Sequence, residues 1–182
     1  MWRPVSVVAL AAALTAASAT PAPLSAQRSR EPAAFGISGG LSLPTGDLKR
    51  GLSTGYSVAG HLLSRQGTVP GLRFRVDVSY DQWAFARDAS VSYRSVGAIV
   101  NAHYRLGANA GGQRTVYLLG GLGLFNDKAA EDPSDTSAGM QAGAGVDVKL
   151  AGLTTFVEAK YVNVFATNRN LIRIPLTVGV RF

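Results

Sequence analysis

Nine charged residues are spaced so that they could form one ionic network. They are Arg73, Arg75, Asp77, Arg105, Asp147, Lys149, Glu158, Lys160 and Arg173, and they lie in segments where polar and apolar residues alternate. In an extended strand, alternate residues share one face. Charges enclosed on such a face need partners, so we expect the three acids to pair with nearby Arg and Lys. Two kinds of chemistry follow: a packed network that closes an interior, or a narrow path for ions.

The two histidines, His61 and His103, fall on the same polar face. Imidazole with a serine and a carboxylate can form a hydrolytic site. No serine stands at a recognisable spacing from either histidine, and the chain has no cysteine. We therefore expect no catalytic residues, no cofactor and no metal site.

A second group of acids gathers in one stretch, at Asp127, Glu131, Asp132 and Asp135. Carboxylate oxygens bind divalent cations, but this spacing lacks the glycine turn and the fixed acid positions of a calcium loop. The stretch predicts a solvated acidic loop that contacts a partner. Arg94 is predicted to face outward near the same end, as a plain surface cation or as a contact for a lipid phosphate.

Eight alternating segments must position these side chains. They cover roughly residues 34–43, 54–63, 72–82, 91–106, 114–124, 138–150, 153–164 and 172–182. The last is the clearest, because every even residue from Ile172 to Phe182 is apolar and every odd one is polar, small or proline. Each segment has about the length of a tilted membrane-spanning strand. We expect connecting loops near 44–53, 83–90, 125–137 and 165–171, and a short link at 151–152.

Glycine placement indicates which face points inward. Most strand glycines, including Gly36, Gly97, Gly145 and Gly179, fall on the polar face. The interior of an eight-stranded barrel is narrow, so small residues belong there beside bulky charges. The apolar face is then outside, which requires lipid. The aromatic residues agree, since Phe35, Phe74, Tyr104 and Phe182 fall near one end of their strands and Tyr56, Tyr80 and Tyr161 near the other.

The N-terminus has the features of an export signal. A basic start at Arg3 precedes an uncharged stretch of apolar and small residues from Val5 to Ala19, with cleavage expected after Ala19 or after Ala26. We expect residues 1–26 to be the signal, 27–33 a polar lead-in and 34–182 one domain. The chain is basic, with a net charge of +7. An exported protein rarely meets nucleic acid, so we expect no such partner and favour anionic lipid head groups.

The eight-strand pattern, the opening run Gly36-Ile37-Ser38-Gly39-Gly40-Leu41-Ser42-Leu43-Pro44-Thr45-Gly46-Asp47 and the ending Val178-Gly179-Val180-Arg181-Phe182 resemble one family. It is the small outer-membrane β-barrel family that includes the OmpA transmembrane domain, OmpX and Ail, and the resemblance covers residues 34–182. It implies an all-β, eight-stranded antiparallel up-and-down transmembrane barrel in the bacterial outer membrane. It also implies that Phe182 belongs to the signal read by the barrel-assembly machinery.

The resemblance implies a structural or surface-interaction protein that presents external loops. Its expected partners are outer-membrane lipid, lipopolysaccharide, the barrel-assembly machinery and an external protein ligand. Divalent ions bound at the acidic loop would bridge the protein to lipopolysaccharide. A small passive pore and a lipid-modifying enzyme are the alternatives in the membrane. A soluble lipocalin-like barrel is a further alternative, and it requires the apolar face to point inward.

Overall fold

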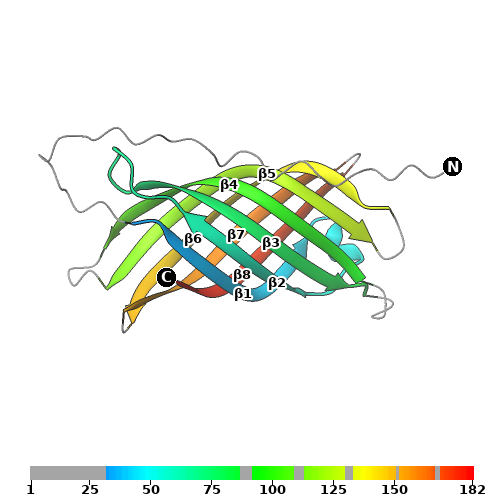
Figure 1. Cartoon of the computed structure of the whole chain (residues 1–182). Coiled ribbons are helices and arrows are strands. Elements are labelled where there is room, and N and C mark those ends of the chain that lie inside the picture. The colour runs from blue at the N-terminus through cyan, green and yellow to red at the C-terminus, as the bar shows by residue number, and fades with distance from the viewer. Residues whose placement is uncertain (1–31, 87–91, 109–112, 130–132, 151, 167–168) are drawn as a thin grey trace, which may run out of the picture.

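The structure, a computed structural model, is an eight-stranded closed barrel. It describes residues 32–86, 92–108, 113–129, 133–150, 152–166 and 169–182. The strands are β1 (Ala34–Thr45), β2 (Gly55–Leu63), β3 (Leu72–Ala84), β4 (Ser92–Ala108), β5 (Arg114–Ala129), β6 (Asp135–Leu150), β7 (Leu153–Ala166) and β8 (Arg169–Arg181), with a short 3-10 helix, η1 (Leu48–Arg50), after β1. Each strand pairs antiparallel with the next (Figure 1). The predicted fold is confirmed.

The first and last strands close the barrel. β1 and β8 pair antiparallel from Gly36 opposite Arg181 to Thr45 opposite Ile172. Beyond them, Phe35 and Phe182 exchange two backbone hydrogen bonds, with N–O distances of 3.1 and 2.8 Å. Closure leaves no free sheet edge, which a strand structure in lipid requires because unpaired backbone groups have no water to bind.

The apolar face points outward, as predicted. Leu122, Phe74 and Leu62 are 60–70% exposed, whereas Arg75, Asp77 and His103 on the alternate face are fully buried. A continuous apolar outer surface of this kind is not stable in water. The soluble lipocalin-like alternative, which reverses the two faces, is therefore wrong.

Large aromatic side chains on the outer surface form two levels. Phe35, Phe74, Tyr104 and Phe182 are exposed near the end of the barrel that holds β1's first residue and β8's last. Tyr56, Tyr161 and Phe165 are exposed near the opposite end. Amphipathic rings favour the head-group level of a bilayer, so the two levels mark the two interfaces.

Several strands run further than the sequence predicted. The expected loop at 125–137 is mostly strand, because β5 continues to Ala129 and β6 begins at Asp135, with Asp127 opposite Asp135. Likewise, Ala166 pairs with Arg169, so only residues 167–168 remain between β7 and β8. Alternation continues through these polar ends, and a polar strand end has the same composition as a loop.

The predicted signal segment and most of the lead-in, residues 1–31, lie outside the described residues. In the part of the chain that is described, no helix has both the length and the hydropathy needed to cross a bilayer.

Candidate functional site

The two ends of the barrel are built differently. We call the end with Ala34, Arg181 and Phe182 the terminal end, and the opposite end, which carries η1, the loop end (Figure 1). Inward-facing side chains fill the interior between them.

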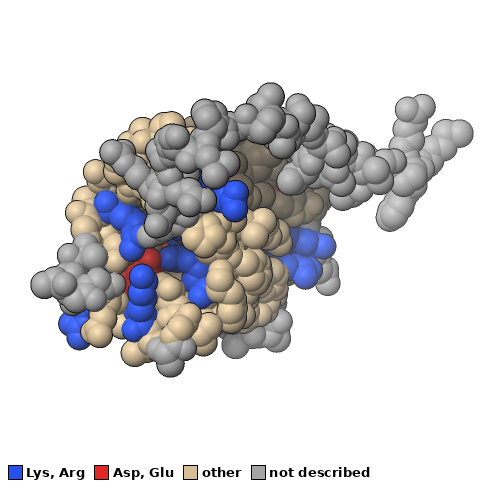
Figure 2. All heavy atoms as spheres, turned by 60° about the vertical axis from the view of Figure 1, so that its left-hand side comes forward, with Lys and Arg blue, Asp and Glu red and all other residues tan. Residues whose placement is uncertain are grey.

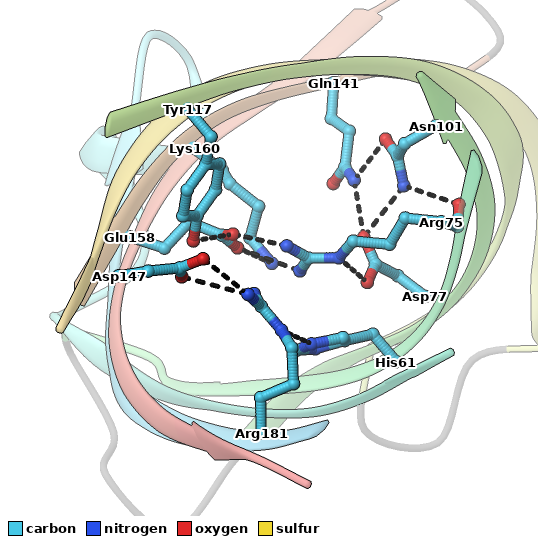
Figure 3. A network of polar contacts seen from close by, with 10 residues as sticks. All are labelled: His61, Arg75, Asp77, Asn101, Tyr117, Gln141, Asp147, Glu158, Lys160 and Arg181. Atoms are coloured by element: carbon cyan, nitrogen blue, oxygen red, sulfur yellow. Dashed lines mark hydrogen bonds and ion pairs between the residues drawn. The ribbon is translucent and has the colours of Figure 1, made fainter. Parts of the chain in front are cut away.

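Arg75 on β3 is the centre of a buried ion network. Its Nε donates to Asp77 Oδ1 at 2.7 Å, while Nη1 and Nη2 donate to the two carboxylate oxygens of Glu158 at 2.5 and 3.0 Å (Figure 3). All three side chains are fully buried. Glu158 lies on β7, across the barrel from β3, so the two-pronged pair spans the interior. Bidentate charge-assisted bonds of this kind are the strong class.

Three neutral side chains and one lysine complete the contacts of both carboxylates. Asp77 Oδ2 accepts bonds from Asn101 at 2.8 Å and Gln141 at 3.0 Å. Glu158 accepts a bond from the Tyr117 hydroxyl at 2.8 Å and lies 3.3 Å from Lys160 Nζ. We call this set the ion network: Arg75, Asp77, Asn101, Tyr117, Gln141, Glu158 and Lys160. Buried charges are tolerable only when satisfied in this way.

A second ion pair lies nearer the terminal end. Arg181 Nη1 donates to both oxygens of Asp147 at 2.9 and 2.8 Å, and its Nε donates to His61 Nε2 at 3.1 Å (Figure 3). The guanidinium also lies over the Phe156 ring, 4.9 Å from its centroid. Aromatic faces attract cations in this geometry.

The loop end is closed by apolar side chains instead. We call this cluster the apolar plug: Leu48, Leu52, Trp83, Tyr93, Ile99, Phe125, Val162, Val164 and Leu171. Leu48 and Leu52 come from the β1–β2 connection and are buried against the strands. The indole Nε1 of Trp83 donates to the Ser42 carbonyl at 3.0 Å, so its one polar group is satisfied.

Glycines make room for the large rings. A Cβ added at Gly97 or Gly139 would lie 2.7 Å from the Phe125 ring, so these two inward glycines flank it. A Cβ added at Gly145 would lie too close to the Tyr117 ring, and one added at Gly179 would lie too close to the Phe156 ring. The sequence predicted small residues inside, and the structure shows that they seat aromatic rings as well as charges.

Arg173 lies against the apolar plug. Its Nε lies 3.4 Å from Asp81 Oδ2, and its guanidinium lies 5.0 Å from the Phe125 ring centroid and 5.5 Å from that of Trp83. Arg173 was expected to pair with one of three acids, Asp77, Asp147 or Glu158. It pairs instead with Asp81, which is not among the nine charges that the sequence pattern singled out.

The structure distributes the nine sequence-selected charges among several places. Arg75, Asp77, Glu158 and Lys160 meet in the ion network. Arg73, Arg105, Asp147 and Lys149 line the terminal end, where Arg73 Nε donates to the Ser64 carbonyl at 2.7 Å and Arg105 Nη2 to Thr115 Oγ1 at 3.0 Å. Lys149 is exposed there. Arg181, the partner of Asp147, is not among the nine charges selected from the sequence.

The acidic stretch is not a loop throughout. Asp127 is a strand residue of β5 that faces inward opposite Ser95 and is 7% exposed. Its assignment to a solvated loop was wrong, because the inward alternation of Phe125 and Asp127 continues past the point where the apolar residues stop. Asp135 is exposed at the start of β6, while Glu131 and Asp132 lie outside the described residues. Arg94 is exposed on the outer surface, as expected.

Neither histidine has the surroundings of a catalytic base. His61 accepts the bond from Arg181, and His103 stacks on Tyr117 with ring centroids 4.4 Å apart. Among the described residues, no serine hydroxyl is hydrogen-bonded to either imidazole. In the same part of the chain, no group of three or more His, Cys, Asp or Glu residues is placed to hold a metal ion.

Comparison with solved structures finds several small outer-membrane barrels. The structure is similar to Neisserial surface protein A, with a TM-score of 0.67 at 18% identity over 84% of this chain and 97% of that one. It is similar to OprG of Pseudomonas aeruginosa, with a TM-score of 0.53 at 11% identity over 84% and 97%. It is also similar to Ail of Yersinia pestis in complex with the heparin analogue sucrose octasulfate, with a TM-score of 0.50 at 12% identity over 84% and 100%. No family model and no curated protein matches the sequence.

The fold and the outer surface together define a class. A closed antiparallel barrel of eight strands with an apolar exterior, two aromatic levels and a polar interior is the architecture of the small bacterial outer-membrane barrels. The chain is a protein of that class, and its place is the outer membrane.

Proposed function

We propose that the chain is a closed barrel that serves as a rigid outer-membrane scaffold and presents its loop end for surface interaction. The observation that carries this proposal is the filled interior. At one level Arg75, Asp77 and Glu158 are fully buried, and at the other Trp83 and Phe125 are 1% exposed. Side chains so inaccessible leave no continuous water path along the axis. A rigid barrel with variable loops is a general arrangement for recognition.

The same observation argues against a passive pore. An ion crossing this barrel would have to separate the Arg75–Glu158 pair and displace the apolar plug. Both steps cost far more than the thermal energy, since breaking a buried pair costs about 3–5 kcal/mol. In planar bilayers we expect the purified, folded protein to give no stable single-channel steps. Regular steps from protein shown to be folded by its heat-modifiable migration in SDS gels would overturn the closed-scaffold proposal.

The loop end is proposed to face the cell exterior and the terminal end the periplasm. The longest connection between strands, residues 46–54, lies at the loop end and supports this orientation, because small barrels carry their longer loops on the extracellular side. The chain has no cysteine, so a single engineered one reports its side unambiguously. Asp47→Cys is expected to react with a membrane-impermeant maleimide on intact cells, and Lys149→Cys only after lysis. The reverse result would invert the orientation.

Surface contact with an anionic partner is supported by charge at the loop end. Lys49 and Arg50 in η1 are exposed, and the outward-facing Arg94 lies directly opposite Lys128 across β4 and β5. The Ail structure with a heparin analogue is a precedent for a polyanion bound to this fold. Removing the two η1 charges together, by K49Q and R50Q, is expected to weaken retention of the folded protein on immobilised heparin. Unchanged retention would contradict an anionic partner at this end.

Assembly by the barrel-assembly machinery is proposed to use Phe182. The side chain is 63% exposed on the lipid-facing surface beside the β1–β8 closure, so a receptor can reach it before closure. Phe182→Ala is expected to lower the amount of folded barrel in cells but leave refolding in detergent nearly unchanged. Equal losses in both would indicate a role in stability alone.

Catalysis is not part of the proposal. Both histidines are engaged in packing or hydrogen-bond contacts, and neither is bonded to a hydroxyl nucleophile in the described chain. Mass spectrometry of lipid A from expressing cells is expected to match that from cells without the protein. A mass change that depends on His61 or His103 would establish a lipid-modifying enzyme.

A further inference from the structure

The terminal end contains a cavity that the scaffold role does not use. It has a volume of about 260 Å³ and opens beside Ala34 and Phe182. Figure 2, which brings this end forward, shows Lys and Arg side chains gathered around the opening with acidic atoms between them. The cationic lining comprises Arg73, Arg105, Lys149 and Arg181, and the acidic lining is Asp147. These lining side chains carry a net charge of +3, and a carboxylate on Phe182 would reduce it to +2.

Two hydrogen-bond donors on the cavity wall remain available. The first is Thr115, which is 3% exposed and whose Oγ accepts from Arg105, so its own proton is directed elsewhere. Arg181 contributes positive charge to the wall but no donor, because Nε and Nη1 bond to His61 and Asp147 and Nη2 is buried. Such a wall favours a ligand that brings acceptor oxygens.

The second donor is the Lys149 ammonium group. Lys149 is exposed at the rim of the cavity and makes no ion pair with any described side chain. Arg73 and Arg105, by contrast, already have partners. The cavity therefore combines a surplus of positive charge, a directed hydroxyl and a flexible ammonium. Phosphate and carboxylate oxygens accept from this combination, because charge-assisted bonds to them are the stronger ones.

The volume of the terminal cavity limits the size of a ligand. Each water occupies about 30 Å³ in the liquid, so the cavity has room for several waters or one small polyatomic anion. We propose that the terminal cavity binds a small water-soluble oxyanion, namely the phosphate or carboxylate group of a low-molecular-weight molecule. The lining side chains that face inward, such as Thr115 and Arg181, cannot meet a lipid head group at the outer surface. In the orientation proposed above, the ligand would come from the periplasm.

Inorganic phosphate is the probe for the test. Calorimetric titration of the folded full chain in neutral detergent, at constant ionic strength, is expected to show saturable binding at one site. Lys149→Gln and Thr115→Val are each expected to weaken binding about fivefold, the size of one hydrogen bond or screened charge. Neither residue belongs to the ion network, so both variants should fold, as their heat-modifiable migration will verify. Lys128→Gln at the loop end removes the same charge and should leave binding unchanged.

Three results would overturn the proposal. In the first, wild-type protein gives no saturable heat. In the second, K128Q weakens binding as much as K149Q, which would reduce the effect to general charge attraction. In the third case, adding phosphatidylglycerol to the micelles displaces phosphate from wild-type protein, which would assign the site to a lipid head group. The titration uses purified protein, so its outcome is independent of the loop-end role and of the membrane orientation.

Discussion

The ion network and the apolar plug close the same barrel by opposite means. In the network, a buried cation, Arg75, is held by two carboxylates that neutral side chains satisfy in turn. In the plug, rings and aliphatic side chains exclude water without charge, and the connection after β1 adds Leu48 and Leu52. Apolar packing tolerates approximate fit, whereas a buried charge tolerates no missing partner. The network should therefore be the more fragile closure when one member is changed.

The largest expected effect is the removal of the central cation. Arg75→Met leaves Asp77 and Glu158 buried without their shared partner, and breaking a buried pair costs about 3–5 kcal/mol. We expect the free energy of unfolding to fall by about 4 kcal/mol, measured by urea titration in detergent with gel migration as the readout. Glu158→Gln, which retains the shape and an acceptor, should cost clearly less. A loss below 1 kcal/mol for R75M would remove the contrast between the two closures.

The corresponding change in the plug is Phe125→Ala. Truncating a buried Phe costs about 3–5 kcal/mol from lost transfer free energy and the cavity that remains. We expect the lower end, about 3 kcal/mol, because Leu48 and Leu52 belong to a connection rather than a strand and can relax into the space. The same urea titration measures it. If F125A costs more than R75M, the plug is the more fragile closure and the comparison is reversed.

The glycines that seat the rings provide a finer test. Gly97→Ala places a methyl group 2.7 Å from the Phe125 ring and 2.9 Å from Ser79 Oγ, and overpacking typically costs about 1–3 kcal/mol. Gly120→Ala is the matched control, because its nearest contact is a backbone oxygen at 3.8 Å. We expect a loss of about 2 kcal/mol for G97A and no loss for G120A. Equal effects would mean that strand propensity, not ring seating, explains the inward glycines.

The smallest effect is expected at the surface of the loop end. Arg50 and Asp47 lie 3.9 Å apart and are 86% and 66% exposed. Exposed pairs contribute about 0–1 kcal/mol, so Arg50→Gln should change the free energy of unfolding by less than about 0.5 kcal/mol. A larger loss would show that η1 holds the plug in place through its charges and not through Leu48.

Alternation in the sequence was sufficient to predict the number of strands and the face that meets lipid, and the family resemblance implied the strand order. The run from Ile172 to Phe182 and the glycines on the polar face carried that inference, because a strand has a side-chain period of two and an eight-stranded barrel has little room inside. Alternation also identified Arg75, Asp77, Glu158 and Lys160 as inward charges. It misplaced Asp127, since a polar strand end and a loop have the same composition.

Only the tertiary structure decided which side chains meet. Arg75 and Glu158 are 83 residues apart and lie on strands that are not neighbours, so their contact depends on the closure and stagger of the whole barrel. Barrel closure also determines that Arg173 pairs with Asp81, that Tyr117 lies over Gly145 and that Leu48 packs into the apolar plug. Local periodicity determines on which face of the strand a side chain lies. The curvature of the closed sheet determines which other side chains it contacts.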